Sequence, residues 1–249
     1  MRFEPRRKND DREPGREGMT VAISYRLRDG SVLLCADQKL TSGSEVQTTV
    51  KIFERTLLPN GGQIIFSLAS DDVARAIGLW PRVALAAAQT GTADDLITEI
   101  TTACANFYSD VLEGEPQRPE IEFVAAIWRP DTKRVVQLAR YDAQVHAVAV
   151  PNRYCAVGSG SQAAGVILKG IGPRAQTQTE CIRTAIAAVK AAKMVDPLSG
   201  GDTDAWILRN GETVHKLTAG EIQEVEQLCV ERSEQSVTLF LAAEEEPTK

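Results

Sequence analysis

The chain contains few of the residues that metal sites and most acid–base sites use. Of its 249 residues only two are histidines, His146 and His215, and neither has Cys, Asp or Glu at ligand spacing. No metal site is therefore expected, and no cofactor is indicated. The five cysteines are scattered without a CxxC pair, which is typical of reduced, mostly buried thiols in a cytoplasmic protein.

Long hydrophobic runs are also absent. No apolar stretch approaches the ~20 residues that span a bilayer, and the charged N-terminal residues lack the apolar middle of a signal peptide. The net charge of −6 and the pI near 5.2 argue against binding to nucleic acid or to an anionic membrane. A hydrophobic fraction of 43% is enough for a substantial core, so the composition predicts a globular protein without either partner.

The first β-prone region reads as a hairpin that begins with a threonine. Residues 21–25 and 31–36 are rich in Val, Ile, Leu and Tyr, and the Arg-Asp-Gly sequence at 28–30 supplies a turn. If Met19 is the start, its removal leaves Thr20 with a free α-amine whose pKa is about 8. Hydroxyl and amine together form a nucleophile with its own base. An ordinary strand threonine fits the same pattern, because threonine favours strands.

Three further motifs follow this hairpin in order. They are Asp37 with TSG at 41–43 and VKIF at 50–53, AVGSGS at 156–161, and DPLSGG at 196–201. Each is a weak signal alone, but together they resemble the proteasome β-type family of N-terminal nucleophile (Ntn) hydrolases over most of residues 20–217. The Met-Thr opening and the RLRDG hairpin are similar to the ancestral-β-subunit group of that family.

The order of predicted elements is strands, two helices, strands, two helices and strands, which indicates an α+β protein. A Thr-x-x-Glu capping box at Thr177 and Glu180 predicts one helix start, and Asn-Gly at 210–211 predicts a hairpin turn. A last helix is expected over about 219–233. The resemblance implies a four-layer αββα sandwich, the fold of Ntn hydrolases.

No linker or repeat divides the chain, so a single hydrolase domain is expected over residues 20–235. It is followed by a C-terminal tail at 236–249 and preceded by a charged segment at 1–19. Three interpretations of that segment stay open: a propeptide, an ordered extension, or sequence upstream of a true start at Met19.

The resemblance assigns roles to three residues around the first motif. Thr20 is the nucleophile, and Lys51 lies beside it as an ammonium that lowers the pKa of the threonine amine and hydroxyl. Asp37 pairs with Lys51 and keeps it charged, because an unpaired buried ammonium is costly. The alternative is an ordinary surface ion pair on neighbouring strands.

The later motifs supply residues that orient the amino terminus through hydrogen bonds. The resemblance assigns this role to Ser159, Asp196 and Ser199. Ser161 takes the place of Ser159 if the alignment shifts within the turn. The alternative for Ser159 is turn chemistry that serves only the backbone, and the alternative for Asp196 is a helix-exit loop residue made rigid by Pro197.

Substrate binding is expected at two positions. The backbone N–H of Ala69 takes the place of the oxyanion donor, where the family usually has glycine, and such a donor is worth roughly 3–4 kcal/mol. Thr41 is expected to line the groove, which binds an extended peptide as an added strand.

The sequence therefore predicts a proteasome-like threonine peptidase that hydrolyses amide bonds of peptides or unfolded proteins. The resemblance implies a homo-oligomeric ring and leaves open an ATPase partner. Two alternatives remain: a catalytically silent, α-like structural ring subunit, and an Ntn amidase that acts on a small molecule. The combination of Thr20, Asp37 and Lys51 argues against a silent subunit.

Overall fold

The computed structural model describes the central body of the chain and its last helix. The described residues are 21–42, 45–48, 51–57, 61–89, 93–110, 113, 119–140, 147–150 and 152–243, and side chains are described except at 40–42, 45–48, 55–57, 93–94 and 233–243. Thr20 and the segment 1–19 lie outside these ranges.

The first sheet is built around the predicted N-terminal hairpin. Its order is β10-β1-β2-β11-β12, and all its pairs are antiparallel. The strands are β1 (Ala22–Arg26), β2 (Val32–Asp37), β10 (Tyr154–Val157), β11 (Thr203–Leu208) and β12 (His215–Lys216). Because β10 and β11 flank the hairpin, the residues that follow β10 and precede β11 lie close to its ends.

The second sheet is also antiparallel, with the order β5-β6-β7-β8-β9. Its strands are β5 (Ile52–Leu57), β6 (Gly62–Ser70), β7 (Ile121–Arg129), β8 (Arg134–Arg140) and β9 (Val148–Ala149). A short hairpin of β3 (Lys39–Ser42) and β4 (Glu45–Thr48) connects the two sheets along the chain.

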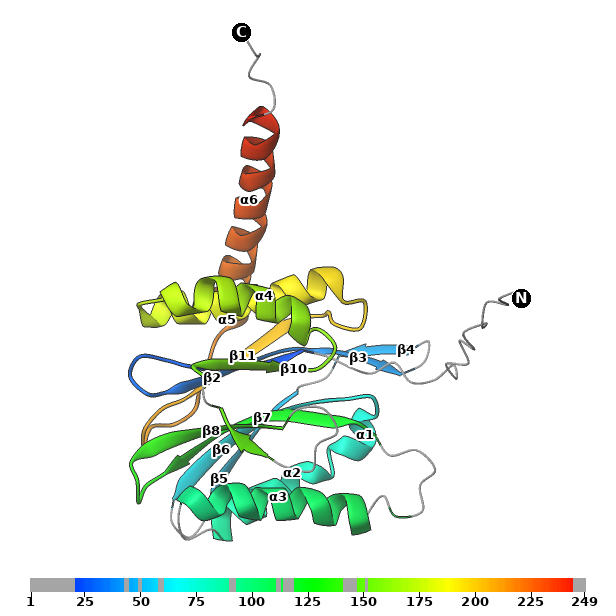
Figure 1. Ribbon diagram of the computed structural model, residues 1–249, viewed down its shortest axis with the longest axis vertical. Helices are drawn as coiled ribbons and strands as arrows, with labels where there is room; N and C mark the ends of the chain where they lie inside the picture. Colours follow the sequence, from blue (N-terminus) through cyan, green and yellow to red (C-terminus); the bar gives the residue numbers. More distant parts are fainter. Residues whose placement is uncertain are drawn as a thin grey trace, which may run out of the picture.

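Helices lie on the outer faces of both sheets (Figure 1). The helices are α1 (Val73–Ala76), α2 (Leu79–Gln89), α3 (Ala93–Asp110), α4 (Ser161–Ile171), the 3-10 turn η1 (Gly172–Arg174), α5 (Gln178–Val195) and α6 (Ala219–Ala243). In Figure 1, α4 and α5 lie over the first sheet, and α2 and α3 lie beneath the second. The expected mixture of helices and stacked sheets is confirmed.

Strand alternation divides the core into three clusters. Ile23, Tyr25 and Cys35 pack towards α4 and α5, whereas Ala22, Leu34 and Ala36 from the same strands pack between the sheets. On the other side, Phe66 and Phe123 pack with α2 and α3. This period-2 pattern is what half-buried strands require, because successive side chains point to opposite faces.

Local features set several of the helix ends, and the predicted capping box is confirmed. Thr177 and Glu180 form the reciprocal capping box at the start of α5. Pro81 lies in the first turn of α2, where its missing N–H removes no helical hydrogen bond. The last helix runs to Ala243, past the predicted end at 233.

The five cysteines are all free, and four of them are buried, as the sequence indicated. Within the described ranges, no helix combines the length and the hydropathy that crossing a membrane requires.

Candidate active site

The Asp37 carboxylate is the centre of the candidate site. It lies at the end of β2, is 0% exposed, and accepts hydrogen bonds from three groups of separate segments. Oδ1 accepts from the Val21 N–H at 3.1 Å and from Lys51 Nζ at 3.1 Å, and Oδ2 accepts from the Gly200 N–H at 2.7 Å. The carboxylate therefore ties the start of β1 to the loop before β11 and to the residue before β5.

Lys51 is buried as completely as its partner. Its side chain is 2% exposed, and besides Asp37 it donates to the backbone carbonyl of Lys39. The alternative of a surface ion pair is therefore wrong: Asp37 and Lys51 form an enclosed pair next to Val21.

Burial and pairing act in opposite directions on the pKa of each group. Loss of water raises the pKa of Asp37, and the Lys51 charge and the Gly200 and Val21 N–H groups oppose that rise. Burial lowers the pKa of Lys51, and the Asp37 charge opposes the fall. Each ion therefore depends on the other to stay charged in this position.

Ser159, Asp196 and Ser199 form a second cluster. Asp196 follows the last turn of α5, and its Oδ2 accepts from Ser159 Oγ at 2.6 Å and from Ser199 Oγ at 2.8 Å. Its other oxygen, Oδ1, accepts the Leu198 N–H at 3.0 Å and shapes the loop. The three residues come from two distant motifs, so the fold brings together what the sequence only implied. Ser161, the alternative to Ser159, is the first residue of α4.

Gly160 shows how closely this cluster approaches β1. A Cβ atom at Gly160 would lie 2.8 Å from Ala192 Cβ, 2.9 Å from Ser199 Oγ and 3.1 Å from Val21 Cβ. Only a glycine leaves room for this contact. Both clusters therefore meet at Val21, whose preceding residue in the chain is Thr20.

The two predicted substrate-binding residues lie on other strands. Thr41 is in β3, paired with Val46, and only its backbone is described. Ala69 is in β6, and its methyl group is buried between the sheets. The pairing of β5 with β6 ends at Ile52 and Ser67. The part of β6 that contains Ala69 therefore extends past the start of β5, which Lys51 precedes.

Sequence reasoning missed one charged residue beside this site, Glu122 of β7. Glu122 is 7% exposed, pairs with Ala69 across the strands, and accepts the Gly158 N–H. The signal for Glu122 was the alternation of side chains along the strand, since Val124 and Ala126 on the same face pack between the sheets. A carboxylate in an otherwise apolar row marks a position that needs a polar partner.

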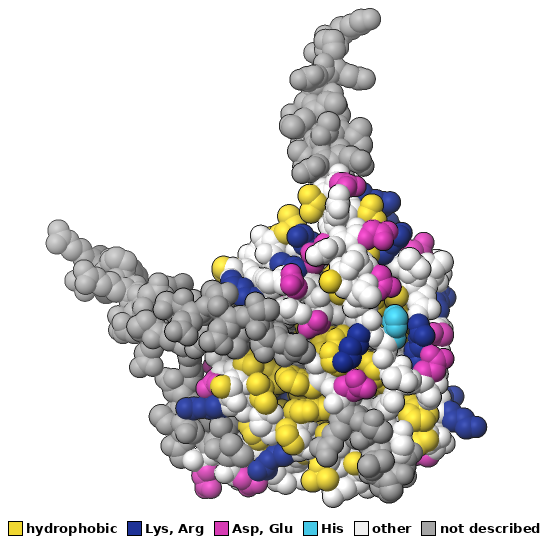
Figure 2. Space-filling model, turned by 180° about the vertical axis from the view of Figure 1, so that it is seen from behind, with side chains coloured by type: hydrophobic (Ala, Val, Ile, Leu, Met, Phe, Trp, Pro, Cys, Tyr) yellow, Lys and Arg dark blue, Asp and Glu magenta, His cyan; other side chains and the backbone are white. Residues whose placement is uncertain are grey.

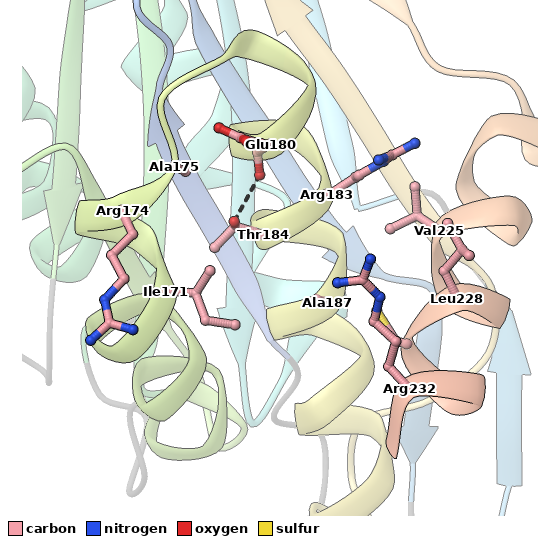
Figure 3. A pocket seen from close by; sticks show the side chains of 11 residues that line it. Ile171, Arg174, Ala175, Glu180, Arg183, Thr184, Ala187, Val225, Leu228 and Arg232 are labelled. Atoms are coloured by element: carbon pink, nitrogen blue, oxygen red, sulfur yellow. Dashed lines mark hydrogen bonds between the residues drawn. The ribbon is translucent and has the colours of Figure 1, made fainter. Parts of the chain in front are cut away.

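A large hollow of the described surface lies elsewhere. A cavity of about 450 Å³ opens between α5 and α6 beside the end of α4, with Ile171, Ala187 and Val225 in its wall and Arg183 and Arg232 near its mouth (Figure 3). None of the predicted site residues lines it. The candidate site is defined by converging buried and half-buried polar groups rather than by this cavity.

Two antiparallel sheets with helices on their outer faces make up a proteasome-like fold. Solved structures of Anbu (ancestral beta-subunit) proteins share it. The Yersinia bercovieri protein superposes with a TM-score of 0.70 at 11% identity, covering 92% of this chain and 99% of that chain. Anbu from Hyphomicrobium sp. strain MC1 gives 0.69 at 10% identity, over 88% of this chain and 97% of that one.

A third structure, the helical assembly of the Anbu complex from Pseudomonas aeruginosa, has a TM-score of 0.66 at 13% identity and covers 92% of this chain and 98% of that chain. No protein-family model and no curated protein sequence matches the chain. At these identities the comparisons establish the fold.

The enclosed ion pair generates a prediction about stability. Lys51→Met leaves the Asp37 carboxylate buried without its counter-ion, so we expect the free energy of unfolding to fall by about 3–5 kcal/mol at pH 7.5. Without Lys51 the folded-state pKa of Asp37 rises further above its unfolded value. Folding then favours protonated Asp37, and the deficit relative to the wild type shrinks as the pH is lowered towards 5.

Urea unfolding followed by circular dichroism measures both effects. Lys169→Met, at an exposed position of α4, is the control and should change stability by no more than about 0.5 kcal/mol. Equal stability of Lys51→Met and the control at every pH would contradict a buried pair.

Proposed function

We propose that this protein is a threonine-type Ntn hydrolase with the αββα architecture, which cleaves peptide amide bonds through Thr20. The observation that carries the proposal is the convergence on Val21 of two polar clusters, one buried and one part-buried. One is the Asp37–Lys51 pair, and the other reaches Val21 through the Gly160 contact. The position directly before Val21 is therefore next to a cation, hydroxyls and a carboxylate. These are the groups that an N-terminal nucleophile needs.

The chemistry begins with proton transfer from the Thr20 hydroxyl to its own α-amine, directly or through water. Oγ then attacks the carbonyl carbon of the substrate, and the N–H of Ala69 stabilises the resulting oxyanion. The amide C–N bond breaks as the α-ammonium returns the proton to the leaving amine. Water attacks the ester that remains on Thr20 Oγ and releases the acid, with the amine again acting as the base.

The surrounding residues have separate tasks in this scheme. Lys51 places a positive charge where it favours the neutral amine and a developing alkoxide. Asp37 holds that charge in place. Ser159, Asp196 and Ser199 hold the amine in the orientation in which it can accept the proton.

Substrates of this site are peptides or unfolded protein segments in an extended conformation. The segment of β6 that continues beyond Ser67 has no β5 residue beside it among the described pairs. An extended peptide fits beside this segment as an added strand, with Thr41 at the other side of the groove. Backbone pairing of this kind accepts many sequences, which suits a peptidase.

We also propose that copies of the chain assemble. Large apolar side chains remain exposed on the outer helices: Val166 is 71% exposed on α4, and Met194 and Val195 are 67% and 68% exposed at the end of α5. Hydrophobic side chains also gather on the face shown in Figure 2. Contacts with neighbouring copies would remove such surfaces from water. An ATPase that supplies unfolded substrate is compatible with a chambered assembly.

The first prediction from the proposed function concerns the nucleophile. Thr20→Ala should lower the turnover of fluorogenic peptides by roughly 10⁴-fold or more, because it removes the attacking oxygen. Thr20→Ser is the matched variant, since it retains a hydroxyl and an amine, and it should keep measurable activity. Covalent labelling by a threonine-directed inhibitor, read by mass spectrometry, should disappear in the alanine variant alone. Unchanged labelling there would refute the assignment.

The second prediction concerns the amine. A chain that retains residues 1–19 should lose activity by on the order of 10²–10⁴-fold, because acylation of the Thr20 nitrogen removes the general base. Intact mass, N-terminal sequencing and peptide turnover are measured together on this chain and on one that begins at Thr20. Full activity from chains shown to retain residues 1–19 would rule out N-terminal nucleophile chemistry.

The third prediction concerns assembly. The wild-type protein should have several times the mass of one chain in light scattering; the chain of 249 residues has a mass of 27.0 kDa, and the form that begins at Thr20 is lighter. Val166→Glu should lower that mass, because it places a charge on an apolar contact. Gln162→Glu, which adds the same charge at an exposed polar position of α4, should leave the mass unchanged. A monomeric wild type would contradict the proposed assembly.

A further inference from the structure

Glu122 occupies a position in β7 where its neighbours are apolar. On one face of β7, Ile121, Phe123 and Ala125 pack in the cluster with α2 and α3. Val124, on the other face of the strand, packs in the cluster between the two sheets. By the same alternation Glu122 points towards the first sheet, and it is 7% exposed.

The carboxylate of Glu122 forms a hydrogen bond between the two sheets. Its Oε2 accepts the backbone N–H of Gly158 at 2.5 Å, and Gly158 follows β10 of the first sheet with φ of +90°. A hydrogen bond to a carboxylate is stronger than one between neutral groups. Glu122 therefore fixes the position of the turn that β10 leads into.

The 158–160 turn and strand β6 each contribute one part of the proposed chemistry. Directly after Gly158 come Ser159, bonded to Asp196, and Gly160, in contact with Val21. In the other direction, Glu122 is the cross-strand partner of Ala69. The backbone around Glu122 thus pairs with the proposed oxyanion donor, and its side chain holds the turn that serves the amine of Thr20.

We propose that Glu122 is a positioning residue for the reaction, which sets the location of the Ser159 turn relative to Ala69. The inference rests on the proposed function. Glu122 acts through Gly158 and Ala69 and does not itself touch the substrate. Glu122 affects the relative position of the nucleophile and the oxyanion donor. A misplacement of about 1 Å between such groups can lower the rate by ~10²-fold.

The structure also offers a matched control, the side chain of Gln137 in β8. It is 1% exposed, and its Nε2 donates to Ser24 Oγ of β1 at 2.7 Å. This is a second buried bond between the same two sheets, and neither partner belongs to the proposed site. Gln137→Ala therefore measures what the loss of an inter-sheet hydrogen bond does by itself.

The experiment compares Glu122→Ala, Glu122→Gln and Gln137→Ala in the full protein. Glu122→Ala should lower kcat by roughly 10–100-fold and change KM by no more than about threefold. Glu122→Gln should stay within about threefold of the wild type, because its amide oxygen can still accept the Gly158 N–H. Gln137→Ala should lower the Tm but leave kcat unchanged.

Hydrogen exchange of the 158–160 turn separates this inference from the proposed function. Protection of the Gly158 amide should fall in Glu122→Ala and persist in Glu122→Gln and Gln137→Ala. A folded Glu122→Ala with wild-type kcat or wild-type protection overturns the positioning role, as does an equal loss of kcat in Gln137→Ala. A wild type that hydrolyses no peptide overturns the proposed function, and the exchange data still decide whether Glu122 holds the turn.

Discussion

The buried Asp37 carboxylate is the constraint on which the organisation of the site depends. Its oxygens accept from Val21, Lys51 and Gly200, which lie in three segments of the chain. A carboxylate without water needs such donors, because an unpaired buried charge is costly. The hydrogen bonds that satisfy the buried Asp37 carboxylate therefore also hold the start of β1, the residue before β5 and the 196–201 loop together. The Ser159–Asp196–Ser199 cluster lies at the same place.

The interface between the sheets carries polar links at selected places in an apolar layer. Val124 and Ala126 fill it, whereas Gln137 reaches Ser24 and Glu122 reaches Gly158. Directional bonds fix the relative position of two sheets more narrowly than apolar contacts do, since hydrophobic burial is non-directional. A reaction that draws groups from both sheets benefits from this kind of restraint.

Much of the fold could be predicted from local pattern. The hairpin around residues 28–30, the capping box at Thr177 and the apolar strand that contains Ala69 follow from turn chemistry, capping and alternation. The prediction was weaker for the last helix, which ends at Ala243, past the predicted end at 233. The local signal for Glu122 was present in the strand alternation, but its partner Gly158 lies far away in the sequence.

By itself the sequence determined the types of elements, the motifs around Asp37, Lys51, Ser159 and Asp196, and the scarcity of histidine. It also supplied Thr20 as a candidate nucleophile. Only the tertiary structure decided that Asp37 and Lys51 are buried together, that both polar clusters meet at Val21, and that Glu122 bridges the sheets. The physical reason is that propensity and periodicity act over a few residues, whereas burial and pKa depend on which distant segments exclude water from the same place.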